Sequence, residues 1–515
     1  MIDLIKTCFV TTVMLLAGLW CMNRAADRTL ARDIGKRLIA LTVISQAAAF
    51  LSPSLALYNL VAALIVPIFA RQRRHVVPVY LFLLLTLPMV ATPLAAAGVY
   101  FASYDISISL GIGAIATLMV RSKGRFSRSL LWDAPALILY VVLVLAYARG
   151  TTATNIMRVI LDQGTQVLLP YYVVSRSIRS PDDLRTAIYS IVAATAALSA
   201  LAIYEALHAW PIYRAVWAHY NIPLGSGASV KLRGGLLRSP GPYPEPTSFA
   251  FCLSVGMLAA IVCKSMFRNA TTRMMVLVLL AAGIFAPQSR GAWIGLIVGI
   301  VAVQIYRRQF TSLARNAVFA GIAALAVFTG AAASSGLAAI LGFSPENSGT
   351  IDYRTNLFSR GLEEVAKHPW FGAPIQEVLY ALRDLQQGEG IVDFVNTFLY
   401  IALIAGVVGF VAFLFTVFLP MVFMWSARAR TLARADYRTV SSYVFGATVC
   451  IIVMLGFTSM GGRSTGLLVT IAAFAASVMN GLGHRDVAAA SRPSVRRAAD
   501  TRGRVLTGSD ATTGA

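Results

Sequence analysis

Three arginines lie at the edges of apolar segments, where charge is otherwise rare. Arg290 stands in APQSRGAWIGLIVGI (286–300), and Arg233 and Arg238 stand in KLRGGLLRSPGPYPEPTSFAF (231–251), each beside a long apolar run. A planar guanidinium group binds phosphate oxygens through two parallel hydrogen bonds, and two or three such groups can replace a divalent cation on a diphosphate. The three arginines therefore predict an anion site, and a lipid diphosphate at a membrane boundary is the anion that fits.

Each arginine segment also has a simpler interpretation. Arg290 could reach from an interfacial position toward water, since a charge near lipid costs about 2.5 to 3.5 kcal/mol at the helix centre and less at an interface. Residues 231–251 could be a solvated loop. The prolines at 240, 242, 244 and 246 exclude a regular helix or a central strand there. Such irregular backbone is tolerated at membrane depth where it lines a cavity.

Candidates for a general base are less sharply defined. His368 in EEVAKHPWFGAP (363–374) can accept a proton near neutral pH, although a histidine before proline is also common at helix ends. Glu245 is the second catalytic candidate, and Glu363, Glu364 and Asp393 are further carboxylates of the same outer segments. No DxD pair, metal-ligand set, P-loop or dinucleotide fingerprint occurs, so we expect neither a metal nor another cofactor.

The elements that must position these residues are membrane-spanning helices. The chain has 515 residues, 57% hydrophobic and 13% charged, with a mean hydropathy of +0.71. Apolar runs long enough to cross about 30 Å of hydrocarbon recur throughout, among them residues 76 to 98. We expect an all-α polytopic membrane protein with about 13–15 transmembrane helices and a large extracytoplasmic helical loop.

The positive charge indicates which way the chain faces. Most of its 44 Lys and Arg residues lie in short segments that alternate with the spans: 22–37, 71–75, 121–128, 176–185, 264–273, 307–315, 427–438 and 485–504. Short basic loops face the cytoplasm. The net charge of +22 therefore reflects topology, and we expect no nucleic-acid partner. Two long polar stretches, about 208–247 and 335–396, then lie outside. Apolar spacing in the second predicts amphipathic helices at 353–366 and 375–387, with Gly388 as a helix stop.

This patterning divides the chain into five parts. They are an N-terminal transmembrane scaffold (1–183), a transmembrane core with outer arginine segments (184–334), an extracytoplasmic loop with two amphipathic helices (335–396), C-terminal transmembrane helices (397–483) and a disordered cytoplasmic tail (484–515).

The order of motifs over residues 184–481 resembles the O-antigen ligase and polymerase superfamily. The similar stretches are LRSPGPYPEPTSFAF, QSRGAWIGLIVGI, HPWFGAP and NTFLYIALIAGVVG. The resemblance implies a membrane glycosyltransferase of GT-C type that acts on undecaprenyl-diphosphate-linked glycans. It implies that Arg238, Arg290 and Arg233 contact the donor diphosphate, that His368 belongs to the active-site loop, and that Asn396 and Arg360 support the site.

One departure bears on the choice within the superfamily. Ligases carry His followed by Asn, Ser or Gln, then nine residues and Gly-x-x-Gly, whereas here Asn396, Gly406 and Gly409 keep the pattern but Val395 stands at the histidine position. Valine cannot transfer a proton. This favours a polymerase of lipid-linked repeat units for O-antigen, capsule or exopolysaccharide over a ligase that transfers glycan to lipid A core. A transporter or flippase is the alternative from another class, but no internal repeat typical of such carriers is evident.

The resemblance also implies a setting and partners. The expected location is the bacterial inner membrane, with a multi-pass chain and an active site on the periplasmic side. The expected partners are the undecaprenyl-diphosphate-linked glycan, membrane lipids and a chain-length regulator.

Overall fold

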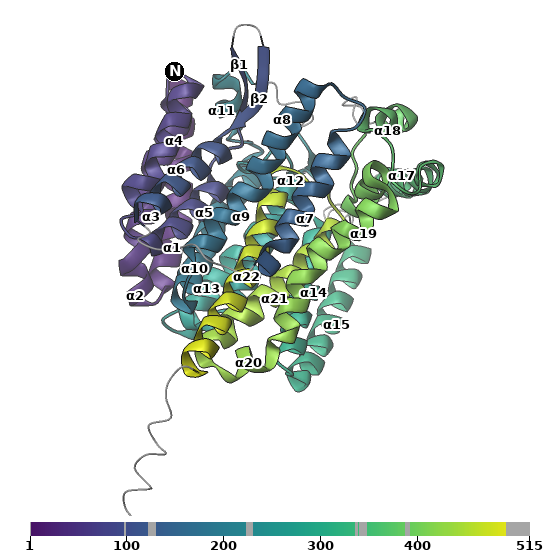
Figure 1. Cartoon of the computed structure of the whole chain (residues 1–515). Coiled ribbons are helices and arrows are strands. Elements are labelled where there is room, and N and C mark those ends of the chain that lie inside the picture. The colour runs from purple at the N-terminus through teal and green to yellow at the C-terminus, as the bar shows by residue number, and fades with distance from the viewer. Residues whose placement is uncertain are drawn as a thin grey trace, which may run out of the picture.

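A computed structural model of the chain describes residues 2–96, 99–121, 130–222, 230–334, 338, 348–386 and 392–490. The described part is a bundle of helices with two short hairpins, which confirms the all-α polytopic fold (Figure 1). Six of its helices are long and apolar enough to cross a membrane: α1 (Ile2–Ala25), the continuous run Arg28–Leu51, α10 (Pro181–His208), α19 (Thr397–Ser426), α21 (Ala435–Leu455) and Arg463–Gly483 within α22 (Gly462–Ala490).

The other elements, together with the three pieces of the run Arg28–Leu51, complete the bundle. In the N-terminal part they are α2 (Arg28–Leu30), η1 (Ala31–Gly35), α3 (Lys36–Leu51), α4 (Leu55–Phe69), η2 (Arg73–His75), α5 (Val76–Thr86), α6 (Ile106–Arg121), α7 (Leu130–Tyr147), α8 (Ala153–Gln163), η3 (Gly164–Leu168) and α9 (Leu169–Ser177). Further on they are α11 (Arg214–His219), α12 (Pro246–Val262), η5 (Lys264–Met266), α13 (Ala270–Phe285), α14 (Arg290–Tyr306), α15 (Phe310–Ala333) and α20 (Arg428–Ala433).

The span expected over residues 76 to 98 is wrong in its second half. Helix α5 ends at Thr86, and the chain then forms a hairpin of β1 (Ala91–Ala96) and β2 (Val99–Asp105). Pro88 explains the end of the helix, because proline disfavours helical backbone at the residue before it and lacks an amide donor. Hydropathy alone could not separate an apolar strand from an apolar helix.

Four of the basic segments, 22–37, 264–273, 307–315 and 427–438, lie at one end of the bundle. The backbone amide of Asp27 donates to Met266 O (2.8 Å), which joins segments 22–37 and 264–273. The Arg428 side chain donates to Tyr306 O (2.6 Å) beside segment 307–315. Helices α2 and α20 mark this end at the bottom of Figure 1. The opposite, upper end carries the β1–β2 hairpin, α8 and α11, so the basic and the polar stretches lie at opposite ends.

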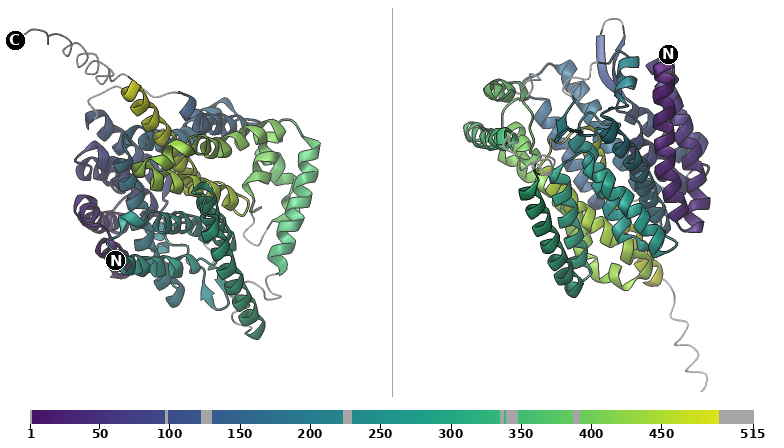
Figure 2. Two further views of the ribbon diagram at one scale, coloured as in Figure 1. Left: turned by 90° about the horizontal axis from the view of Figure 1, so that it is seen from below. Right: turned by 180° about the vertical axis from the view of Figure 1, so that it is seen from behind.

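The described part of the large loop forms helices, which also lie at the upper end of the bundle. α17 (Ser348–Lys367) and α18 (Ile375–Ala381) correspond to the two expected amphipathic helices, and η7 (Arg383–Leu385) follows α18. They project beside α15, on the side of the bundle away from the N-terminal helices (Figure 2). Gly388 lies outside the described residues. At the other terminus α22 continues through Ala490, into the tail that was expected to be disordered.

Labelling of single cysteines tests the sidedness that the basic segments predict. In a chain whose five native cysteines are replaced by alanine, cysteines at Ser127, Arg308 and Arg434 should be shielded from a membrane-impermeant thiol reagent in intact cells. Cysteines at Ser226 and Glu389 should react, because their segments belong to the opposite side. The reverse pattern would overturn the orientation. Ser127, Ser226 and Glu389 lie outside the described residues.

Candidate active site

The expected arginines line one cavity of about 430 Å³ at the upper end of the bundle. Its walls come from residues 231–248, the turn between α13 and α14, the start of α17, residues 393–395 and the segment 457–459. Arg233, Arg238 and Arg290 all contribute to this lining. Because Arg290 faces a protein cavity, the geometry favours the interior-facing interpretation over the interfacial one.

A tight hairpin positions Arg233 and Arg238. Strands β3 (Leu232–Arg233) and β4 (Leu236–Leu237) pair through a two-residue turn, Gly234 and Gly235, whose φ angles are +57° and +77°. Two positive φ values in succession are characteristic of a type I′ turn and suit glycine. The backbone amide of Arg238 donates to Lys231 O (2.9 Å), which brings both arginines to the same side of the segment.

The hairpin is fixed to the turn that precedes α14. Arg233 Nη1 donates to Gln288 O and Arg238 Nε donates to Pro287 O, each at 3.2 Å. Each guanidinium uses only some of its five donors in these bonds. The contacts therefore orient both side chains while leaving N–H groups available to a ligand.

A buried carboxylate, not anticipated from the sequence, holds the chain after the hairpin. Glu205 in α10 is 0% exposed and accepts hydrogen bonds from Ser239 Oγ (2.5 Å), Gly241 N (3.0 Å) and Ile212 N (3.0 Å). A buried charge is tolerated only when such partners satisfy it. Glu205 therefore ties the proline-rich segment to a spanning helix. A lone acidic residue in an apolar run was the signal that could have singled it out.

Close helix packing positions Arg290. It is the first residue of α14, whose glycines face α21: a Cβ at Gly295 would lie 2.4 Å from Met454 Cγ, and one at Gly299 would lie 2.9 Å from Cys450 Cβ. Small residues let helix backbones approach closely in membranes. The glycine spacing in SRGAWIGLIVGI thus fixes α14 against α21. It also presents the positive N-terminal end of α14, with Arg290, to the cavity.

A fourth arginine, which the sequence analysis missed, completes the cluster. Arg354 in α17 lines the cavity, and its Nε is buried without a hydrogen-bond partner. The neighbouring Tyr353 hydroxyl donates to Asp393 O and accepts from Asp393 N, both at 3.0 Å. These bonds hold the first part of α17 against residue 393. Arg354 was one of several charges on an amphipathic helix, so nothing in its spacing distinguished it.

The cluster is electrostatically unfavourable without an anion. Burial, together with the charge of Arg290, lowers the pKa of both Arg233 and Arg354. Burial and the charge of Arg233 lower the pKa of Arg238 to about 10, which still leaves it protonated at neutral pH. Like charges held close disfavour the charged state, whereas an anion between them relieves the repulsion. Among the described lining residues, five are basic and two, Glu245 and Asp393, are acidic.

The two acidic lining residues come from different segments of the chain. Glu245 precedes α12 and forms an ion pair with Lys231 at 3.0 Å. Asp393 Oδ1 accepts from Ser459 Oγ at 3.5 Å. Both carboxylates therefore come from segments that also carry or contact the basic cluster. Either can receive a proton from a hydroxyl bound in the cavity.

His368 and Arg360 do not line the cavity, contrary to expectation. His368 is exposed at the end of α17. Arg360 is exposed and faces Glu363 (3.7 Å) and Asp384 (3.6 Å). Both belong to the outer surface of the loop, and this geometry gives neither a contact with the arginine cluster.

The HPWFG segment (residues 368–372) packs against a break in helix α19, and we call it the clamp. α19 is interrupted at Gly406 (φ +62°, ψ −167°), and the amides of Val407 and Val408 donate to Pro369 O (2.8 Å) and Trp370 O (3.1 Å). A Cβ on Gly406 would lie 2.5 Å from backbone atoms of that segment. Gly406 thus permits both the break and the contact. The Gly-x-x-Gly pattern after Asn396 therefore has a structural explanation.

Arg149 of the α7–α8 connection secures the same clamp. Its guanidinium donates to Gly372 O (3.1 Å), Phe371 O (2.5 Å) and Ile404 O. Because α17 joins the clamp directly, these bonds help to hold the helix that carries Arg354.

Asn396 and Val395 stand where the motif predicts a functional pair. The Asn396 side chain caps α19 by accepting from Phe398 N (2.9 Å) and Leu399 N (3.3 Å). Val395 lines the arginine cavity. A histidine at that position would face the cluster, so its replacement by valine removes a proton-transfer group from this wall.

One known family matches part of the chain. Residues 275–414 match the family described as O-antigen ligase, a range that contains Arg290, Arg354 and Val395. No curated protein matches the chain. The match supports a function of the ligase or polymerase type in O-antigen-related synthesis, carried out by a glycosyltransferase-like membrane enzyme. The helical multi-pass fold and this match over residues 275–414 support the resemblance of the chain to the O-antigen ligase and polymerase superfamily.

Proposed function

We propose that the protein polymerises lipid-linked oligosaccharide repeat units. It transfers a growing glycan from an undecaprenyl diphosphate to a hydroxyl of an incoming unit. The observation that carries this proposal is the convergence of Arg233, Arg238, Arg290 and Arg354 on one cavity at the end of a membrane bundle. A diphosphate offers several anionic oxygens, which suits several guanidinium groups.

The size and charge of the cavity support a diphosphate with its first sugar. Its volume of about 430 Å³ lies within the range of small-ligand sites, about 300 to 1,000 Å³. The positive end of α14 adds to the potential that attracts an anion. Arg233 and Arg238 are held by protein carbonyls before any ligand binds, so little reorganisation of these two side chains accompanies binding.

The proposed reaction needs a stabilised leaving group and an acceptor for one proton. The acceptor hydroxyl oxygen attacks the anomeric carbon of the donor sugar and forms the new glycosidic bond. The bond from that carbon to the diphosphate oxygen breaks, and its electron pair leaves with the diphosphate, which the arginines hold. The hydroxyl proton passes to Glu245 or Asp393, the carboxylates that line the cavity. The donor is already activated, so this step uses no nucleotide and no metal.

A ligase is the alternative, because the matching family is described by that activity. Val395 argues against it, since this cavity-lining position carries the histidine in the ligase pattern.

Deletion of the gene in its native host distinguishes the two activities. Loss of a polymerase should leave single repeat units on the lipid carrier or at the cell surface. Loss of a ligase would instead leave long glycan chains on the carrier, because polymerisation would continue without transfer to lipid A core. Long lipid-linked chains in the deletion strain would overturn the polymerase proposal.

A further inference from the structure

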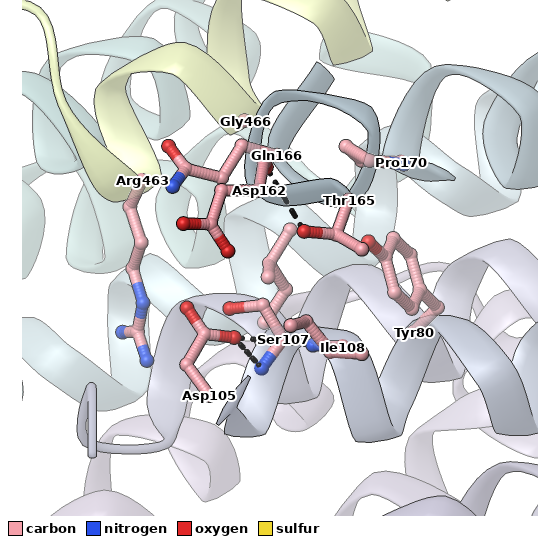
Figure 3. A pocket seen from close by; sticks show the side chains of 11 residues that line it. Tyr80, Asp105, Ser107, Ile108, Asp162, Thr165, Gln166, Pro170, Arg463 and Gly466 are labelled. Atoms are coloured by element: carbon pink, nitrogen blue, oxygen red, sulfur yellow. Dashed lines mark hydrogen bonds between the residues drawn. The ribbon is translucent and has the colours of Figure 1, made fainter. Parts of the chain in front are cut away.

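A second, smaller cavity lies among the N-terminal helices, in a part of the chain to which the proposed reaction assigns no role (Figure 3). Its volume is about 50 Å³, and its polar lining comes from α5, the end of β2, the start of α6, α8, η3 and the start of α22. Arg463 and Tyr80, at 3% and 1% exposed, form its buried side. Asp162 and Thr165 are partly exposed and Gln166 is exposed, so the cavity opens beside α8 and η3.

Arg463 presents one unused edge of its guanidinium group. Its Nη1 donates to Leu85 O (3.0 Å), and the group lies 4.7 Å from the ring centroid of Tyr243. Its Nε and Nη2 are buried without hydrogen-bond partners. These two atoms form the side-on fork of arginine. A buried donor without a partner costs about 1 to 3 kcal/mol, and more when the group is charged. This edge is therefore poised for a ligand.

Carboxylates approach the same space from the other walls. Asp105 accepts from Ser107 N (2.7 Å) and Ile108 N (3.1 Å), and it faces Arg463 across the cavity in Figure 3. Within the described residues, Asp105 and Arg463 form no ion pair. Asp162 also lines the cavity, and Thr165 Oγ1 donates to its backbone carbonyl at 2.9 Å. Two carboxylates and one guanidinium group therefore line the second cavity.

The mixture of charges selects the kind of ligand. An anion would meet two carboxylates, and a cation would meet Arg463. A neutral hydroxyl group can donate to a carboxylate and accept from a guanidinium at once. The cavity volume corresponds to roughly one or two waters, at about 30 Å³ each. It therefore fits one hydroxyl or hydroxymethyl substituent, with the sugar ring at the mouth near Gln166.

Two short stretches of chain connect the second cavity to the arginine cavity. Residues 457–459 line the arginine cavity, and Arg463, a few residues later in the chain, lines the second. Tyr243, under Arg463, precedes Glu245 of the arginine cavity by two residues. We propose that the second cavity is a subsite for a neutral sugar of the acceptor repeat unit, an inference that rests on the proposed transfer reaction.

Two binding measurements on the purified full-length protein test this subsite. One probe is the free repeat-unit oligosaccharide, released from the host's lipid-linked units by mild acid. The other is undecaprenyl diphosphate without glycan. Arg463→Met and Asp105→Asn should each raise the dissociation constant for the oligosaccharide at least tenfold and leave that for undecaprenyl diphosphate within twofold. Arg290→Ala should show the opposite pattern.

A variant at the mouth of the second cavity keeps the test valid even if the variants at buried positions fail to fold. Gln166 is exposed, so Gln166→Trp should fold normally, cover the cavity and weaken oligosaccharide binding to the same extent. Unchanged oligosaccharide binding in Gln166→Trp, or no binding by the wild type, would mean that the cavity holds only water and would overturn the subsite. If the variants selectively lose oligosaccharide binding but the wild-type protein forms no glycan chains, the subsite stands and the polymerase proposal is rejected.

Discussion

Replacement of Arg290 by lysine is expected to remove most glycan transfer, with a loss of about 10² to 10³ in rate, the usual effect of deleting one donor to a developing anion. Lysine keeps the charge but not the planar two-donor fork, so it cannot reproduce a bidentate contact with phosphate. Arg290→Ala should lose at least as much. The rate of glycan transfer is measured on purified variants that elute from a size-exclusion column at the same volume as the wild-type protein.

Arg360→Lys is the matched control for this result. Arg360 belongs to the same end of the molecule, but it is exposed, and among the described residues its ion-pair partners are the exposed carboxylates Glu363 and Asp384. Its replacement should leave the rate within about twofold, because exposed ion pairs contribute about 0 to 1 kcal/mol. Wild-type turnover in Arg290→Lys would return Arg290 to the role of an interfacial anchor.

Removal of the general base should give the second large effect. Of the isosteric variants Glu245→Gln and Asp393→Asn, at least one should lower the rate by about 10² to 10⁴, the range for general acid–base catalysis. Both changes retain size and hydrogen bonding but remove the proton acceptor. His368→Ala should change the rate by less than tenfold, since His368 is exposed outside the cavity. Near wild-type rates in both carboxylate variants, or a large loss in His368→Ala, would contradict this assignment.

The sequence predicted the bundle better than its irregular parts. Long apolar runs with basic flanks predicted a bundle of spanning helices, among which are α10 and α19, because membrane helices must be apolar over a fixed length. The β1–β2 hairpin escaped the same reasoning, since its residues are also apolar.

The site was predictable only where a charge was locally unusual. Arg233, Arg238 and Arg290 stood out in apolar or proline-rich surroundings, and the structure brings them to one cavity. Arg354 did not, because charges are ordinary on an amphipathic helix. Its position depends on long-range contacts, such as that of Tyr353 with Asp393, which a single sequence does not reveal.

The position of His368 outside the arginine cavity has a similar cause. Its motif suggested chemistry, but the following residues dock on the break at Gly406. The break in α19 and the segment that docks on it are both tertiary features. Glycine-containing motifs in this loop therefore reflect close backbone contact.

The most direct test of the central claim is a reaction of the purified protein with lipid-linked repeat units alone. The products are separated by size after release from the lipid. Polymerisation predicts a ladder whose steps equal one repeat unit, formed without lipid A core. Products that stay at one unit, and grow in mass only when lipid A core is supplied, would contradict the account and identify a ligase.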